Sequence, residues 1–140
     1  LYPGIELDGG PTVMFHSYST GFRFLHDDIS ITPYRAIHSE GTNPHMLRIE
    51  WNGIVVAYTG DTQWTDDIIP LSDGADLFIC EASAFRKPAY NHLSVEELSA
   101  NRERLRAKRI VLTHPGPETL SNLDGIPFEL AMDGDILMND

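Results

Sequence analysis

The first third of the chain alternates between apolar and polar residues in short stretches, which is the pattern of half-buried β-strands. This alternation predicts three strands, over residues 12–18, 21–25 and 29–37. Pro33 lies within the third stretch and has no backbone N–H to donate to a neighbouring strand. The third strand is therefore expected at an edge of the sheet or at a β-bulge.

The middle of the chain contains a hairpin signal. Residues 46–51 and 54–58 are two strand-like stretches separated by Asn52-Gly53, a pair that favours a type I′ turn between antiparallel strands. After this hairpin, residues 62–71 are expected to form a short helix. Thr65 is its expected N-cap, because a threonine side chain can accept from the free N–H groups of the first turn.

Strand and helix patterns alternate in the second half. Apolar stretches predict buried strands at 75–80 and 110–113. Between them, the sequence SVEE at 94–97 is a capping box that opens a helix expected to reach about Lys108. A last hairpin is expected over 128–140. This order predicts an α/β fold, and the hairpins make its sheet mixed.

The composition is that of a globular domain of ordinary length. The 140 residues are 41% hydrophobic and 22% charged, which suits one domain with a core of its own. No apolar stretch approaches the roughly 20 residues that cross a bilayer, so no membrane partner is expected. The single cysteine, Cys80, excludes an internal disulfide and indicates a reducing compartment, hence a cytoplasmic location.

The chain is strongly acidic. Its formal net charge of −11 repels polyanions and disfavours a nucleic-acid partner without excluding one. A small-molecule or phosphodiester substrate remains compatible with this charge, because a metal ion can reverse the local field.

Two apolar strands are followed by residues of types that commonly serve as metal ligands. The segment VVAYTGDT contains Asp61, and the segment IVLTHPGP contains His114. The carboxyl ends of buried strands collect ligands in α/β folds, and a carboxylate with an imidazole suits a hydrolytic metal centre. The alternatives are an Asx turn or helix cap for Asp61 and a hydrogen-bonded turn residue for His114.

Four segments in order, VVAYTGDT, DLFICEASAF, NHLSVEEL and IVLTHPGP, resemble the later motifs of the metallo-β-lactamase-fold hydrolases. The subgroup similar to ribonuclease Z is the nearest match, and the resemblance is strong over residues 30–123. It implies half of an αββα sandwich, with a mixed sheet and flanking helices. It also implies that residues 1–140 are the C-terminal part of a single domain of this fold.

The resemblance implies three metal ligands. Asp61 matches the aspartate whose two oxygens bridge two metal ions, and His114 matches the last histidine, which binds the second ion. His38 matches the histidine that completes the first ion's coordination. His45 nearby is an alternative to it, and a solvated loop histidine is another. The implied ions are two zinc ions, with manganese or iron as alternatives.

The resemblance also implies a catalytic pair. His92 matches a loop histidine that donates a proton to the leaving oxygen or stabilises the transition-state charge. Glu81 matches the acidic partner that would orient this histidine. The alternative is that Ser94 is a plain helix cap and His92 a surface residue.

One signature of the family is missing. No His-x-His-x-Asp-His string occurs among the six histidines. Its absence predicts an N-terminal half, upstream in the same gene product or lost, that supplies the remaining ligands and covers an apolar sheet face. The segment alone is therefore expected to be inactive, and homodimer formation stays open.

The implied activity is that of a binuclear metallohydrolase, in which a hydroxide bridging the metal ions attacks the substrate. His92 and Glu81 favour phosphodiester bonds as the target. Carboxylic esters, lactones and thioesters remain open, because a fold does not fix a substrate. The rival from another class is a non-catalytic, truncated or degenerate domain that binds a partner through its uncovered sheet.

Overall fold

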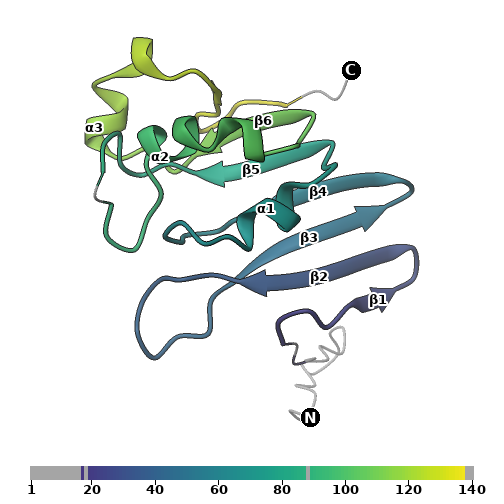
Figure 1. The fold of residues 1–140 in the computed structure, drawn as a ribbon. Helices are drawn as coiled ribbons and strands as arrows, with labels where there is room; N and C mark the ends of the chain where they lie inside the picture. The colour runs from purple at the N-terminus through teal and green to yellow at the C-terminus, as the bar shows by residue number, and fades with distance from the viewer. Residues whose placement is uncertain (1–16, 18, 88, 138–140) are drawn as a thin grey trace, which may run out of the picture.

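A seven-stranded sheet organises the chain (Figure 1). The computed structural model describes residue 17 and the ranges 19–87 and 89–137. The strands are β1 (Phe24–His26), β2 (Ile29–Arg35), β3 (His45–Trp51), β4 (Ile54–Tyr58), β5 (Leu77–Glu81), β6 (Arg109–Thr113) and β7 (Glu129–Leu130). They lie in sequence order, with β1 to β4 antiparallel and β4 to β7 parallel. The predicted α/β fold with a mixed sheet is confirmed.

The hairpin predicted in the middle of the chain is present. β3 and β4 pair from Trp51 opposite Ile54 to Leu47 opposite Tyr58. The two turn residues, Asn52 and Gly53, both have positive φ, at 50° and 80°. A type I′ turn requires positive φ at both central positions, which is why an Asn-Gly pair closes this hairpin.

Pro33 lies in β2, which is the second strand of the sheet rather than its edge. The strand tolerates a proline there because β1 pairs with β2 only as far as Ile31. On its other side Pro33 pairs with Leu47 of β3. On the β1 side no strand residue of the described chain pairs with it, and its carbonyl oxygen accepts from Gly21 N at 2.8 Å. Of the first two predicted strands, 12–18 lies almost entirely outside the described residues, and 21–25 corresponds to β1, which begins three residues later.

The helices are short. They are α1 (Ile68–Ser72), α2 (Val95–Ala100) and α3 (Pro117–Leu120), with the 3₁₀ turns η1 (Arg102–Arg104) and η2 (Leu123–Gly125). In the described part of the chain, none is long and apolar enough to span a membrane.

The helix expected over 62–71 begins later, at Ile68, and the residue at its N-cap position is Asp67 rather than Thr65. Asp67 makes no side-chain cap bond, whereas Thr65 Oγ1 accepts from the Asp67 N–H at 3.4 Å in the turn before the helix. The preceding residues are occupied elsewhere: the backbone N–H of Thr62 donates to Glu81, and the Gln63 N–H donates to the Ile37 carbonyl. These contacts hold the segment in an extended loop.

The helix expected to reach Lys108 ends at Ala100. It starts as predicted, because Ser94 Oγ accepts from Glu97 N at 3.1 Å. At the other end the side chain of Asn101 donates to the Glu97 carbonyl at 2.9 Å. This side-chain bond occupies a carbonyl of the last turn, and the chain continues as a 3₁₀ turn.

The hairpin expected over 128–140 is also different. Only β7 is a strand in its described part, and it pairs parallel with β6. A turn is present at Asp133-Gly134, with Asp135 N donating to the Met132 carbonyl at 3.1 Å.

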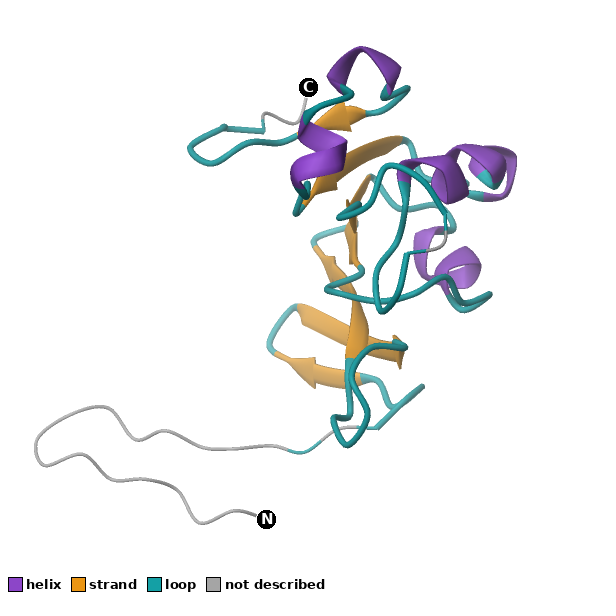
Figure 2. Cartoon of the chain, turned by 90° about the vertical axis from the view of Figure 1, so that its left-hand side faces the viewer, coloured by secondary structure: helices purple, strands orange, loops and turns teal. Residues whose placement is uncertain are grey.

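The core lies on the face of the sheet that α1 and α2 cover. Figure 2 shows the sheet from the side, with helices against this face. Side chains from β3, β4, β5 and β6 alternate towards this face and are buried there. With the apolar residues of the two helices they form the core: Met46, Ala57, Phe78, Cys80, Leu112, Ile68, Leu71 and Leu98.

The opposite face of the sheet is apolar and open. By register, Leu47 pairs with Tyr58 and Tyr58 with Ile79, so these side chains share that face. On this face Trp51 is 52% exposed and Tyr58 is 41% exposed. Val111, which pairs with Ile79, is buried, so the face is covered at β6 and open over β3 and β4. The fold is thus one sheet with α1 and α2 on one side, which is half of an αββα sandwich.

Candidate metal centre

Four strands deliver their carboxyl ends to one edge of the sheet (Figure 1). β2 and β4 are each antiparallel to β3, so they run in the same direction, and β5 and β6 are parallel to β4. His38 follows β2, Asp61 follows β4, Glu81 ends β5 and His114 follows β6. Ring contacts to His38 and His114 place the loop residue His92 between them. The structure therefore brings all five predicted site residues together.

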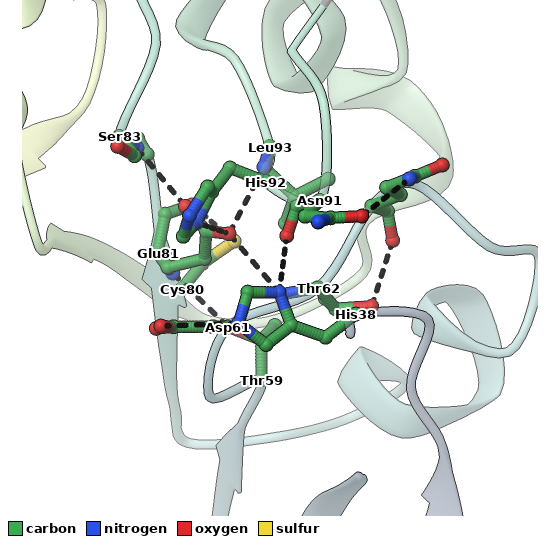
Figure 3. A network of polar contacts seen from close by, with 12 residues as sticks. His38, Thr59, Asp61, Thr62, Cys80, Glu81, Ser83, Asn91, His92 and Leu93 are labelled. Atoms are coloured by element: carbon green, nitrogen blue, oxygen red, sulfur yellow. Dashed lines mark hydrogen bonds and ion pairs between the residues drawn. The ribbon is translucent and has the colours of Figure 1, made fainter. Parts of the chain in front are cut away.

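Glu81 is the buried hub of this edge (Figure 3). Its side chain is 1% exposed. Oε1 accepts from Thr62 N at 3.1 Å, from Leu93 N at 3.0 Å and from His92 Nδ1 at 3.0 Å, while Oε2 accepts from Ser83 N at 3.0 Å. A buried carboxylate is tolerated when it is hydrogen-bonded in this way, and here it joins three loops.

The contact with Glu81 fixes the protonation pattern of His92. A carboxylate oxygen accepts, so Nδ1 carries the proton and Nε2 is left free to accept, bind a metal ion or carry a second proton. The His92 side chain is 26% exposed. The same carboxylate–imidazole arrangement orients histidines at metal and catalytic centres.

His38 is fixed by a backbone carbonyl. Its Nδ1 lies 2.9 Å from the carbonyl oxygen of Asn91, which can only accept, so the proton is on Nδ1. The other ring nitrogen, Nε2, lies 3.9 Å from Asp61 Oδ2. With neutral His38, both facing atoms are acceptors, and 3.9 Å is too long for a hydrogen bond.

The donor set fits a divalent cation. His38, Asp61 and His92 each offer one atom, and the three atoms lie within 4.8 Å of one another. Zinc binds imidazole nitrogen and carboxylate oxygen at about 2.0–2.2 Å, so two ligands of one tetrahedral ion lie about 3.3–3.6 Å apart. The 3.9 Å between His38 Nε2 and Asp61 Oδ2 is close to this spacing, and small side-chain rotations would bring these atoms to it. His45, by contrast, bonds to Asn43 and Thr20 away from the cluster.

His114 lies beside the cluster rather than within it. Its ring stacks on His92 with centroids 5.5 Å apart. It has φ of 56°, a left-handed conformation that is uncommon outside glycine. The next turn is anchored at Gly116, whose N–H donates to the Ser83 carbonyl at 3.0 Å. The turn that carries His114 is therefore tied to the residues that follow Glu81.

Cys80 takes no part in metal binding by this arrangement. Its side chain belongs to the core face, and burial raises the pKa of its thiol. A thiol that stays protonated is a poor metal ligand.

A pocket of about 550 Å³ opens beside the cluster. Asp61, Glu81 and His114 lie on one part of its wall, and Tyr58 and Met132 add apolar surface. Neither Tyr58 nor Met132 was predicted as a site residue. Met132 lies in the segment predicted to be a hairpin, and Tyr58 is the last residue of β4, where its sequence position carries no sign of a pocket.

Two further residues, Asn91 and Gln63, support the site and were not predicted. Asn91 supplies the carbonyl that binds His38, and Gln63 Nε2 donates to Asn91 Oδ1 at 3.2 Å. The available signal was an asparagine directly before a candidate histidine, since asparagine tolerates the left-handed conformation in loops.

Curated relatives match part of the chain. An uncharacterized protein of Mycobacterium tuberculosis is 34% identical over 95 residues, which is 65% of this chain and 34% of the relative. The ribonuclease Z of Pyrococcus furiosus is 41% identical over 83 residues, covering 56% of this chain and 25% of that protein. The chain thus spans about a third or less of the length of these relatives.

Solved structures share the fold. The metallo-β-lactamase fold protein YhfI of Bacillus subtilis superposes with a TM-score of 0.68 at 22% identity, covering 86% of this chain and 54% of YhfI. Zinc-bound PqqB of Methylobacterium extorquens gives 0.69 at 15% identity, with coverage of 88% and 55%. The short form of human tRNase Z gives 0.58 at 21% identity, with coverage of 81% and 42%.

A family model matches a longer part of the chain than either curated relative does. The family model described as "Beta-lactamase superfamily domain" matches residues 3–115. With the metallo-β-lactamase fold of its structural neighbours, this match shows that the chain belongs to the β-lactamase superfamily domain family.

Proposed function

We propose that the chain supplies part of the catalytic centre of a metal-dependent hydrolase that acts on phosphodiester bonds. The observation that carries the proposal is the convergence of His38, Asp61 and His92 within 4.8 Å, with His92 held by buried Glu81. Membership of a hydrolase superfamily supports it.

His38 and Asp61 are the proposed ligands of one cation, because His38 Nε2 presents a lone pair to a carboxylate oxygen 3.9 Å away. Asp61 is also the proposed bridge to a second cation, with His114 as a further ligand of that ion. Bound zinc, or manganese or iron in its place, would act as a Lewis acid that offsets charge developing on the scissile group.

His92 and Glu81 are the proposed catalytic pair. The buried Glu81 carboxylate accepts a hydrogen bond from His92 Nδ1 at 3.0 Å and so keeps a proton on that nitrogen. Nε2 is therefore the atom that can carry and deliver a second proton. An imidazolium held in this way is stabilised by the adjacent carboxylate. Delivering that proton to the leaving oxygen would promote cleavage of the ester bond.

Phosphodiesters are the proposed substrate class because a proton donor beside a cation suits a departing alkoxide, and because the names ribonuclease Z and tRNase Z describe enzymes that cut RNA. Carboxylic esters, lactones and thioesters are the alternatives within the same fold. The net charge of −11 favours a small substrate over a long polyanion.

The open apolar face is the proposed contact surface for an N-terminal half of the domain. The chain covers 54% of YhfI and 55% of PqqB, so each of these structures contains a comparable length of chain that has no counterpart here. Burial of Trp51, Ile54 and Tyr58 by such a half would complete the sandwich.

The test compares four forms of the full protein as its gene encodes it: wild type, Asp61→Ala, His92→Ala and His45→Ala. Bound zinc, manganese and iron are measured by mass spectrometry, and hydrolysis is measured with bis-p-nitrophenyl phosphate, p-nitrophenyl acetate and a simple lactone. We expect Asp61→Ala to lose metal and activity, His92→Ala to lose activity while keeping metal, and His45→Ala to match wild type.

Each contrary result has a defined meaning. A wild-type protein that binds no metal contradicts the enzyme proposal and favours a non-catalytic binding domain. Loss of metal in His92→Ala makes His92 a ligand rather than a proton donor. Faster cleavage of the acetate or lactone than of the phosphodiester moves the substrate class to those esters.

A further inference from the structure

His38 is held by its ring rather than by its strand. β2 ends at Arg35, and His38 follows in a segment without regular structure. Its Nδ1 donates to the carbonyl oxygen of Asn91 at 2.9 Å, although the two residues are 53 positions apart in sequence. The direction in which Nε2 points therefore depends on where the Asn91 carbonyl lies.

The Asn91 carbonyl reaches His38 through an uncommon backbone conformation. Asn91 has φ of 61°, in the left-handed region that asparagine tolerates better than most residues but that glycine alone visits freely. Such a conformation persists only when surrounding contacts hold it. Contacts near Asn91 are therefore expected to keep it in this conformation.

Gln63 supplies such a contact from the loop that follows β4. Its side-chain Nε2 donates to Asn91 Oδ1 at 3.2 Å. Its backbone N–H donates to the carbonyl of Ile37 at 2.7 Å, directly before His38. Gln63 thus binds the residue that precedes His38 and also the residue that accepts from the His38 ring.

The contacts form a closed circuit around His38. The Ile37 N–H donates to Thr62 Oγ1 at 2.9 Å, which ties the backbone before His38 to the loop that carries Asp61. The same loop, through Gln63 and Asn91, ties down the His38 ring. The loop of Asp61 therefore holds both the backbone that precedes His38 and, through Asn91, the His38 ring. The Asp61 carboxylate in the same loop faces His38 Nε2.

We propose that Gln63 and Asn91 are positioning residues that fix the ring orientation and the tautomer of His38. The bond between their side chains holds the Asn91 carbonyl against Nδ1, so the unprotonated Nε2 faces Asp61. The inference deepens the proposed function, since it rests on His38 as a metal ligand. The state of the ring itself can nevertheless be measured without a metal ion.

The test uses the full protein with three substitutions. Gln63→Met keeps length and bulk but removes the donor. Asn91→Gly removes the acceptor from the other side and keeps a backbone that adopts positive φ without strain. Asn91→Asp keeps an acceptor oxygen for Gln63. Asn122→Ala is the matched control, because Asn122 donates to the Glu118 carbonyl at an exposed turn.

Two readouts are measured on each form. Heteronuclear NMR of the metal-free protein reports which His38 nitrogen carries the proton, and a chelator competition gives the dissociation constant for zinc. We expect Gln63→Met and Asn91→Gly to mix the two tautomers and to weaken zinc binding by about 10–100-fold, as loss of a ligand's supporting contact does. The double variant Gln63→Met/Asn91→Gly should weaken zinc binding little more than either single variant, because both substitutions remove the same hydrogen bond.

The conservative variant and the control complete the argument. Asn91→Asp should keep the single tautomer and bind zinc at least as tightly as wild type, and Asn122→Ala should change neither readout. Unchanged tautomer populations in Gln63→Met and Asn91→Gly would overturn the inference. A wild type that shows one His38 tautomer but binds no zinc would contradict the proposed function while leaving the positioning of His38 standing.

Discussion

Glu81 Oε1 accepts a hydrogen bond from His92 Nδ1 at 3.0 Å, and the Glu81 side chain is 1% exposed. The same oxygen accepts from the backbone of two loops, at Thr62 and Leu93. The orientation of His92 and the packing of the loops around it therefore depend on one buried carboxylate.

We expect Glu81→Gln to destabilise the fold. One side-chain oxygen would become an NH₂ group that faces a backbone N–H, and a buried donor left without an acceptor costs about 1–3 kcal/mol. The free energy of unfolding from urea titration measures this loss. Glu118→Gln is the control, since Glu118 is exposed and accepts a long 3.4 Å bond from Arg86 N. Equal stability of the two variants would mean that Glu81 is not a structural hub.

Gly116 is required where the His114 turn meets the end of β5. A Cβ placed there would lie 2.4 Å from the backbone oxygen of Ser83, which cannot move without shifting the residues after Glu81. We expect Gly116→Ala to lower the free energy of unfolding by about 1–3 kcal/mol through overpacking. Differential scanning calorimetry measures the change.

Gly125→Ala provides the comparison for Gly116. A Cβ at Gly125 would lie 2.8 Å from Cζ of Phe85, which is the far end of a side chain that can rotate. We expect this variant to lose less stability than Gly116→Ala. The reverse order would contradict the close approach of the His114 turn to Ser83.

Asp76 makes stability depend on pH in the acid range. Lys108 Nζ at 2.7 Å, and then the Val55 N–H at 2.7 Å, hold the pKa of its carboxyl below the ordinary value of 3.8. A lowered folded-state pKa stabilises the fold above the unfolded-state pKa, and this contribution is lost as the pH falls through the folded value. We expect wild type to be more stable than Asp76→Asn at neutral pH, with a difference that narrows below 3.8.

Urea titrations across the acid range test this dependence. Lys108→Met should remove much of the same pH-dependent difference, because it deletes the partner with the largest effect on Asp76. A gap between wild type and Asp76→Asn that stays constant with pH would show that Asp76 acts through its hydrogen bond to Val55 without any pKa shift.

Cys80 should be unreactive in the native protein. Burial raises the pKa of its thiol, and its Sγ donates to the Glu81 carbonyl at 3.4 Å. The thiolate is the reactive form, so we expect no labelling by Ellman's reagent at about pH 8 until urea unfolds the chain. Rapid labelling in native buffer would mean that the core face opens readily.

Local signals predicted the parts of the fold that local chemistry decides. The turn at Asn52-Gly53 needs only two residues that accept positive φ. The start of α2 needs only Ser94 beside the free N–H of Glu97. The end of α2 depends on Asn101, whose side chain competes for a helical carbonyl, and residue type alone did not decide that competition.

The candidate site divides in the same way. Asp61 and His114 could be predicted because each follows an apolar strand, and strand direction carries both to one edge of the sheet. The role of Glu81 came from the family resemblance. The bond from His38 to Asn91 could not be predicted, because its acceptor is a backbone carbonyl 53 residues away whose direction follows from φ at Asn91. Backbone acceptors leave no trace in residue identity, so contacts of this kind become visible only in the structure.

Zinc should stabilise the protein through the His38–Asp61 pair. A ligand that binds only the folded state adds about 2.7 kcal/mol to the free energy of unfolding when its free concentration is about 100 times its dissociation constant. We expect zinc to raise the midpoint of thermal unfolding in wild type and in His45→Ala, and EDTA to reverse the shift. In His38→Ala the shift should be smaller, because one imidazole facing Asp61 is gone. If zinc raised the midpoint of His38→Ala as much as that of wild type, His38 would not be a zinc ligand. If zinc no longer raised the midpoint of His45→Ala, the ligand would be His45. Either result would contradict the proposed centre.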